Sequence, residues 1–265
     1  MPEVGTANAG VAARAEDASI AASNPPGMAR LEKAEVMVTI QPIITDLKFQ
    51  PGAGTTTTGP DGDGGVVLPA AGLFYVQPLG KDWRFGVSLG TYMGLGAKYE
   101  DDWVGRYYVQ ESALITLDLV PSLSYRVNDW LSIEAGLMLQ YAYLKNTLAL
   151  STTANAQYDD TFHVAVGAHY RFHPKWRATA GFAYDSSPVG DADRTVSLPL
   201  DRNFRYSAGL IYDVTQRITT GLAYTFIDAG SASVNQTRGP LSGTIQGDYS
   251  SNYIHVVALN FAMRF

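Results

Sequence analysis

The sequence predicts an all-β fold: an antiparallel transmembrane β-barrel of about ten strands, preceded by an N-terminal segment. Three observations favour this class. Long segments alternate apolar with small or polar residues, short turns alternate with long polar loops, and the chain stops on an aromatic residue. The alternative is a soluble sandwich with a C-terminal edge strand, but a sandwich gives no reason for the sorting of the loops.

The C-terminal segment, from Tyr253 to Phe265, reads YIHVVALNFAMRF and alternates to its last residue. Leu259, Phe261 and Phe265 fall on one face, whereas Arg264 falls on the other. A final strand with an aromatic residue at the membrane interface is typical of bacterial outer-membrane barrels. We therefore expect this strand to carry the recognition signal for the barrel-insertion machinery, and the outer face of the barrel to contact outer-membrane lipid.

Alternation recurs through most of the chain after residue 34. The apolar set is odd-numbered in Ala113–Val127 and even-numbered in Phe162–Phe172. These segments are longer than the five or six residues of a usual soluble strand. The predicted strands cover residues 34–48, 66–79, 83–97, 111–127, 130–147, 158–173, 175–187, 203–214, 216–229 and 249–265.

The connections between these segments are of two kinds. Short turns include 80–82, 128–129 and 173–175, and each is followed at once by a tryptophan: Trp83, Trp130 and Trp176. The other connections are long and polar, for example 186–203 and 230–248. Outer-membrane barrels have short periplasmic turns, long extracellular loops and aromatic girdles at the interfaces. The sequence therefore predicts one closed sheet with the three tryptophans on one rim.

Composition restricts the classes of function. The chain has 265 residues, no cysteine and a formal net charge of −6, which argues against a nucleic-acid partner. No stretch approaches the length of apolar residues that a transmembrane helix needs. The start at Met1 has neither the basic residues nor the apolar run of a signal peptide, so we expect such a signal to be missing from this sequence.

Residues 1–33 do not follow the barrel pattern. They are rich in alanine, and Ala12–Ala22 is a candidate short helix that Asn24, Pro25, Pro26 and Gly27 would stop. One interpretation is a disordered or trimmed tail. The other is a plug inside the barrel, which makes residues 1–33 a hatch and residues 34–265 the barrel.

In this segment the chain resembles the FadL/TodX family of outer-membrane transporters of long-chain fatty acids and aromatic hydrocarbons. The family hatch has an alanine-rich A-x-A-x-D-A-S stretch followed by N-P-A-G-M-x-x-L. This chain has Ala13–Ser19 in the first pattern and Asn24, Pro25, Gly27 and Met28 in the second, with Pro26 in place of alanine. Further echoes follow in order at 102–107, 120–128, 183–189 and 198–202.

The resemblance implies an outer-membrane location and passive uptake of a hydrophobic small molecule. It also places a lateral opening in the third strand, near Gly90, Gly94 and Gly96, where family members have an inward kink. Ordinary glycine packing against a crowded lumen is the alternative for these residues. Family members are wider barrels of about fourteen strands, and this chain lacks a central block between Asn146 and Tyr158. Its lumen should therefore be narrower.

Charged residues fall on the inward faces of the predicted strands. They form a structural network that fills the lumen, or one unpaired arginine receives the carboxylate of an amphipathic ligand, as basic lumen residues do in the family. Charges in a narrow lumen must pair or stay hydrated. The candidates are Arg84, Asp118, Arg126, Glu134, Arg171 and Arg205, with Arg177, Asp185, Asp213 and Arg264 on the same faces.

No residue pattern indicates catalysis, a cofactor or a metal site. His163, His169 and His173 share one face but lie about 20 and 13 Å apart along a strand. Asp61 and Asp63 hint at calcium, but Gly72 stands where a calcium loop needs its last carboxylate. The sequence therefore predicts a hydrophobe channel that is not an enzyme. A plugged, non-transporting barrel is the alternative, and a barrel enzyme ranks below both.

Overall fold

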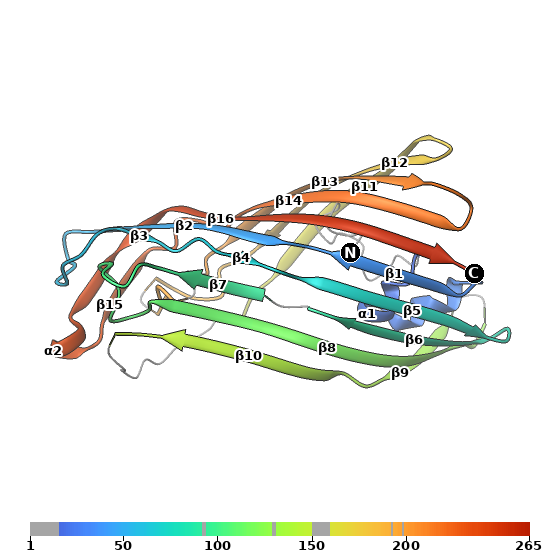
Figure 1. Cartoon of the computed structure of the whole chain (residues 1–265), viewed down its shortest axis with the longest axis horizontal. Helices are drawn as coiled ribbons and strands as arrows, with labels where there is room; N and C mark the ends of the chain where they lie inside the picture. Colours follow the sequence, from blue (N-terminus) through green and yellow to red (C-terminus); the bar gives the residue numbers. More distant parts are fainter. Residues whose placement is uncertain (1–15, 92–93, 129–130, 150–159, 192, 198) are drawn as a thin grey trace.

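The computed structural model describes residues 16–91, 94–128, 131–149, 160–191, 193–197 and 199–265. These residues form one sixteen-stranded sheet, with two short α-helices and one 3₁₀ helix (Figure 1). Within this part of the chain, no helix has the length and apolar character needed to cross a membrane. The all-β prediction is confirmed.

The elements follow the chain in simple order. The helices are α1 (Ile20–Ser23), η2 (Pro25–Arg30) and α2 (Gly239–Ser242). The strands are β1 (Glu35–Ile40), β2 (Ile43–Pro51), β3 (Gly62–Asp63), β4 (Val67–Leu68), β5 (Ala71–Leu79), β6 (Trp83–Gly90), β7 (Gly94–Lys98), β8 (Glu111–Arg126), β9 (Ser132–Gly136), β10 (Leu139–Thr147), β11 (His163–His173), β12 (Trp176–Asp185), β13 (Asn203–Asp213), β14 (Ile218–Asp228), β15 (Val234–Thr237) and β16 (Thr244–Arg264). The hydrogen-bonded path is β10-β8-β6-β5-β1-β16-β14-β13-β12-β11, and all pairs are antiparallel.

The sixteen strands differ from the expected ten because several predicted strands are interrupted. The segment predicted at 34–48 is β1 and β2, which keep the same register on β16: Ile40 faces Leu259 and Ile43 faces Val256. Prolines at 42 and 69 lie in the two gaps of the first hairpin, since proline cannot donate to a ladder. β15 lies in a segment expected to be a loop.

The predicted closed sheet is not what the structure shows. β10 and β11 are the two ends of the path, and no pairing joins them in the described part of the chain. Both strands are largely exposed on both faces. The opening falls at the position where the sequence lacks its central block, between Asn146 and Tyr158.

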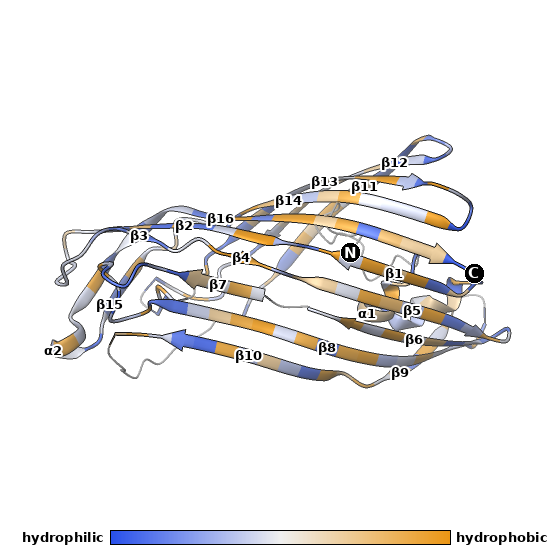
Figure 2. Ribbon diagram, viewed as in Figure 1, coloured by the Kyte–Doolittle hydropathy of each residue, from blue (hydrophilic) through white to orange (hydrophobic). Residues whose placement is uncertain are grey.

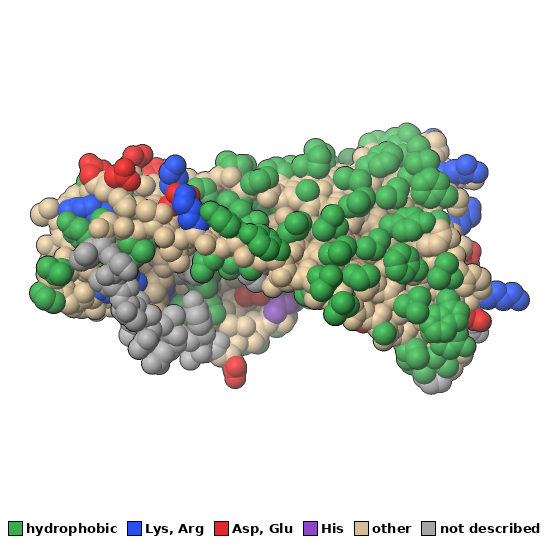
Figure 3. Space-filling view, turned by 60° about the horizontal axis from the view of Figure 1, so that its bottom comes forward, with side chains coloured by type: hydrophobic (Ala, Val, Ile, Leu, Met, Phe, Trp, Pro, Cys, Tyr) green, Lys and Arg blue, Asp and Glu red, His purple; other side chains and the backbone are tan. Residues whose placement is uncertain are grey.

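The predicted alternation of faces is confirmed along the paired strands. In β1, Met37 and Thr39 are buried while Val38 and Ile40 are exposed, and β8 buries Ser122 and Ser124. Hydrophobic and polar residues alternate along the ribbons (Figure 2), and hydrophobic side chains cover much of the strand surface in the face that Figure 3 shows. The exposed apolar face is the one that suits lipid.

The C-terminal strand joins the two halves of the sheet. β16 pairs with β1 on one side and with β14 on the other, and the Phe265 N–H donates to the Ala34 carbonyl at 2.8 Å. Two of the predicted rim tryptophans contact tyrosines on neighbouring strands: Trp83 meets Tyr125 and Trp176 meets Tyr212, with ring centroids 4.6 and 4.4 Å apart. The third, Trp130, lies outside the described residues.

A hydrophobic core forms at the end of the sheet that carries the long loops. Trp103, fully buried, stacks on Tyr99 with centroids 4.0 Å apart, and its indole N–H donates to the Val109 carbonyl at 2.6 Å. Phe49 and Tyr249 close the cluster from β2 and β16. Burial raises the pKa of the Tyr99 phenol, which shares a hydrogen bond with the Tyr249 hydroxyl. The segment 98–110, which lies between two predicted strands, is therefore a packed part of the end with the long loops.

Candidate functional site: a lumen segment beside a break in the wall

Residues 16–33 pack against the concave face of the sheet near the end with the short turns (Figure 1). Ala18, Ile20, Ala21 and Met28 are buried in one cluster with side chains from the strands, namely Met37, Phe74, Val76 and Ala262. α1 stops at Asn24 because two prolines follow, and Pro25 begins the 3₁₀ helix η2. The Asn24–Met28 motif thus forms the turn that seats Met28.

Two arginines of the inward face hold the end of this segment. The Arg84 Nε donates to the Leu31 carbonyl at 2.7 Å, and the Arg126 guanidinium donates to the Ala29 carbonyl. Arg84 itself is buried. Two of the six lumen charges that the sequence nominated are therefore bound to backbone carbonyls of residues 16–33. This described segment forms no strand, so no ladder uses those carbonyls.

The start of the segment is held by a carboxylate that sequence reasoning missed. Glu35, almost fully buried on β1, accepts a hydrogen bond from the Ala18 N–H at 2.8 Å and one from Arg264 Nε at 2.5 Å. Arg264 also donates to the Glu16 carbonyl at 3.1 Å. Burial raises the pKa of the neighbouring Asp17 carboxyl, which accepts hydrogen bonds from Ser19. The sequence offered one signal for Glu35: it is odd-numbered, as are the other residues of β1 that point into the lumen.

Met28 lies against Gly86 of β6. A Cβ added at Gly86 would come within 2.2 Å of the Met28 Sδ, so a larger residue there would force the methionine side chain to shift. The expectation that this segment faces Gly90–Gly96 is not met by Met28, which contacts Gly86, four residues nearer the short turns. Residues 1–15 lie outside the described part of the chain.

The other candidate charges are held by neighbouring strands. Asp118, fully buried, accepts hydrogen bonds from Gln140 Nε2 at 2.6 Å and from Thr116 Oγ1 at 2.9 Å. Arg205 pairs with Asp185 at 2.9 Å, and Arg171 lies 3.6 Å from Asp213. Glu134 is exposed on β9. The pairing supports a structural network for the four arginines and Asp118 rather than a free arginine that awaits a carboxylate.

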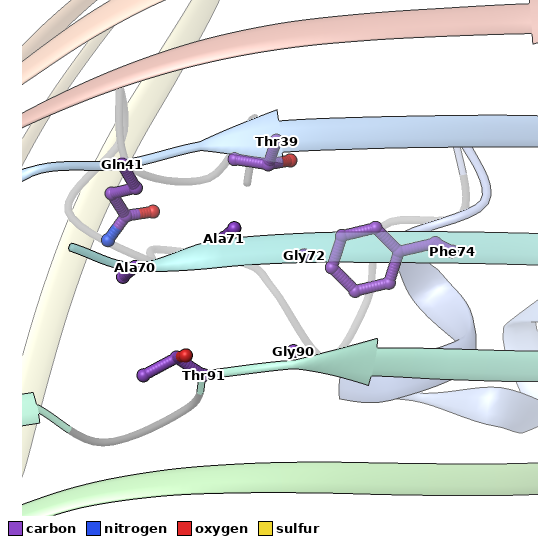
Figure 4. A pocket seen from close by; sticks show the side chains of 8 residues that line it. All are labelled: Thr39, Gln41, Ala70, Ala71, Gly72, Phe74, Gly90 and Thr91. Atoms are coloured by element: carbon purple, nitrogen blue, oxygen red, sulfur yellow. The ribbon is translucent and has the colours of Figure 1, made fainter.

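The wall beside this segment is broken between β4 and β7. The β5–β6 ladder ends at the pair Gly72 and Gly90, and no ladder pairing links β4 with β7 among the described residues. Isolated backbone bonds flank the break: Thr91 N–H to Ala71 O and Lys98 N–H to Gly64 O, each 3.0 Å. At the near end a cavity of about 20 Å³ lies among the side chains that Figure 4 labels, from Thr39 to Thr91.

A change of register along β8 accompanies the break. On β8, Asp118 faces Gly90 but Ile115 faces Gly94, so four steps on one strand match three on the other. One extra residue reverses which side chains point inward. Leu95 and Ala97 now share the inward parity of Leu114 and Ser112, and Gly94 and Gly96 turn outward.

β7 is displaced toward the lumen at this point. The outward side of Gly94 meets Ile43 Cδ1, which would lie 3.7 Å from an added Cβ, and that of Gly96 meets Leu68 and Val66 side chains at 3.4 Å. Ile43 and Leu68 face each other across β2 and β4. Apolar side chains, rather than a backbone ladder, therefore close the wall where the sequence nominated Gly90, Gly94 and Gly96.

The contact of Met28 with Gly86 gives a prediction. Gly86→Leu should lower the free energy of unfolding by about 1–3 kcal/mol, because it overpacks the space of Met28. Adding Met28→Ala should restore most of that loss, measured by urea unfolding in lipid vesicles. Gly190→Leu, where an added Cβ meets nothing within 4 Å, is the matched control. Strictly additive effects of the two substitutions would place Met28 elsewhere.

Proteins of known function are related to this chain in sequence. The long-chain fatty acid transport protein of Escherichia coli K12 is 26% identical over 111 residues, which are 41% of this chain and 24% of that protein. Outer membrane protein P1 of Haemophilus influenzae is 25% identical over 241 residues, 83% of this chain and 50% of that one. The chain thus spans half or less of the length of these relatives.

Solved structures show the same fold. A Pseudomonas aeruginosa FadL homologue matches with a TM-score of 0.87 and 16% identity, covering 100% of this chain and 98% of that one. The toluene transporter TodX of P. putida matches with a TM-score of 0.70 and 12% identity, covering 94% of each chain.

The family evidence covers nearly the whole sequence. Two overlapping matches, over residues 2–151 and 143–265, join at the position of the missing central block. The chain therefore belongs to the family described as outer membrane protein transport protein (OMPP1/FadL/TodX), and it is an outer-membrane protein.

Proposed function

We propose that this chain lets hydrophobic small molecules, long-chain fatty acids or aromatic hydrocarbons, cross the outer membrane by passive diffusion. The break between β4 and β7 is the observation that carries the proposal. It is closed by Ile43, Leu68 and Val66 side chains, which can move apart without breaking a backbone hydrogen bond. An apolar molecule in the lumen would leave sideways through these side chains into the lipid.

Residues 16–33 act in this proposal as a hatch. They pack against the strands near the short turns, beside a cavity of about 740 Å³ that Glu16 and Arg264 border, and Met28 lies at Gly86 rather than at the break. Because Arg84, Arg126 and Arg264 all donate to carbonyls of this segment, the block is fixed rather than loose. The segment narrows the straight path through the barrel, which favours the sideways route.

We further propose that the barrel has about ten continuous strands and closes by pairing β10 with β11, since an open strand edge is not tolerated in lipid. The two edges belong to one chain and end an antiparallel path of even length, so they are antiparallel to each other. Their outer faces are both apolar, with Leu139 and Tyr141 on β10 and Val164 and Val166 on β11.

Cysteine pairs across this seam test the closure. The chain has no native cysteine, so Tyr141→Cys can be combined in turn with Val164→Cys, Val166→Cys or Ala168→Cys. We expect one combination to form a disulfide within the monomer in outer-membrane fractions. Disulfide-linked dimers in place of cross-linked monomers would contradict closure within one chain.

The transport proposal predicts that filling the break slows uptake. Gly94→Leu would place a large side chain between Ile43 and Leu68, and uptake of oleate or toluene into proteoliposomes should fall at least several-fold. Gly52→Leu is the control, because Gly52 is exposed away from the break and an added Cβ there meets only Gln246 atoms at 3.5 Å or more. Equal uptake by both folded variants would rule out the break as the exit.

The assembly of this barrel should depend on its last residue. We propose that β16 with Phe265, which is 60% exposed, presents the signal to the insertion machinery. Deleting Phe265 should reduce the heat-modifiable barrel in outer-membrane fractions, whereas Leu241→Ala, at a 78% exposed residue near the loops, should not. An unchanged yield would leave Phe265 as an interfacial aromatic alone.

One observation favours a second function. The enclosed cavities at the break and in the lumen are about 20 and 40 Å³, so neither holds an aromatic ring as it stands. A plugged structural barrel that transports nothing fits those volumes. Wild-type protein that moves neither oleate nor toluene into proteoliposomes, while remaining folded, would decide for this alternative.

A further inference from the structure

The connection between β12 and β13 folds into the lumen instead of extending into solvent. Val196 in this connection is completely buried in the cluster of Trp103, Phe49 and Tyr249, and its carbonyl accepts a hydrogen bond from the Tyr249 hydroxyl at 3.1 Å. Asn252 on β16 donates to the Pro199 carbonyl at 3.0 Å. The inward loop, defined as the described residues 187–191, 193–197 and 199–202, is thus attached to the wall from inside.

A single buried arginine organises the inward loop. Arg194 is 2% exposed, and its guanidinium donates to three backbone carbonyls: Leu200 at 2.6 Å, Ser233 at 2.8 Å and Val189 at 3.2 Å. It also pairs with Asp201 at 3.3 Å and with Asp191 at 2.5 Å. A buried guanidinium is tolerated only with such complete pairing, and its planar fork fixes several groups at once.

The inward loop faces the displaced strand β7. A cavity of about 40 Å³ lies between Pro199 and Leu200 on the loop and Leu95 and Ala97 on β7, with Leu47 and Ile254 along its sides. The same β7 segment borders the break through Gly94 and Gly96. The inward loop and β7 therefore border one space next to the break.

We propose that Arg194 is a positioning residue that holds Pro199 and Leu200 against β7, and so sets the size of molecule that reaches the break. An engineered cavity that takes up benzene measures about 150 Å³. The present space is smaller, so passage requires Leu200 to withdraw, and the Arg194 bonds oppose that withdrawal. This inference rests on the proposed function, because it assigns a size limit to that route.

Two substitutions weaken this constriction in different ways. Arg194→Ala releases the whole inward loop, whereas Leu200→Ala removes the side chain at the constriction and leaves the clamp intact. Asp193→Asn is the matched control, since it removes a charge from the same loop outside the clamp. Heat-modifiable migration in gels confirms folding, and Leu200→Ala carries the test if Arg194→Ala does not fold.

The readout is a ratio of two uptake rates into proteoliposomes: the bulky probe N-phenyl-1-naphthylamine over toluene. Leu200→Ala and folded Arg194→Ala should raise this ratio several-fold, while Asp193→Asn keeps the wild-type value. A general loss of stability would not change the ratio in this direction. Folded variants with the wild-type ratio would overturn the inference.

Conductance in planar bilayers with potassium chloride separates this inference from the proposed function. Releasing the inward loop should raise ion conductance even if no hydrophobe is transported. Raised conductance without any hydrophobe uptake would refute the proposed function and keep the constriction. Unchanged conductance together with an unchanged uptake ratio would refute the constriction.

Discussion

The structure depends on one constraint: lipid offers no partner for a backbone N–H or C=O. Most of this chain meets the constraint with long antiparallel ladders, such as β16 against β1, β2 and β14. At two places the ladder stops. One is the break between β4 and β7, and the other is the pair of edges on β10 and β11. These two places are where the fold leaves room for function and for assembly.

The break is made by a small change with large consequences. One extra residue before Gly94 turns Leu95 and Ala97 inward and brings the bare backbone of Gly94 and Gly96 against Ile43 and Leu68. Glycine matters here because it lets the displaced strand approach those side chains closely. The result is a stretch of wall held by dispersion and burial, which opens at far lower cost than a ladder of hydrogen bonds.

Both ends of the lumen beside this stretch are occupied by chain from the protein itself. Residues 16–33 lie on one side, tied by Arg84, Arg126 and the Glu35–Arg264 pair. The inward loop lies on the other, tied by Arg194. Arginine suits this role because its fork donates to carbonyls that no strand neighbour can serve. With chain from the protein at both ends of the lumen, the stretch of wall without a ladder supports the sideways exit proposed above.

The sequence was sufficient to predict the class of fold, because the alternation of faces is a local pattern that lipid and lumen enforce directly. The sequence contains the prolines at positions 42 and 69, but it does not show whether they interrupt a ladder, because that depends on which residues of the neighbouring strand they face. The change of register between Gly90 and Gly94 was not predictable, since a single extra residue is detected only by comparison with the partner strand β8. Glu35 with Arg264 was missed because these residues lie 229 positions apart in the chain. Arg194 was also missed, because its hydrogen bonds form only when the loop turns into the lumen, and the sequence does not reveal that turn.

The most direct measurement is photo-cross-linking of purified protein with a diazirine-bearing fatty acid, followed by mapping of the modified residues. If a hydrophobe leaves through the break, adducts concentrate on Ile43, Leu68 and the residues of β7. Adducts confined to Arg171, Lys175 and their neighbours at the end with the short turns would mean passage straight through the barrel, and would contradict the sideways route.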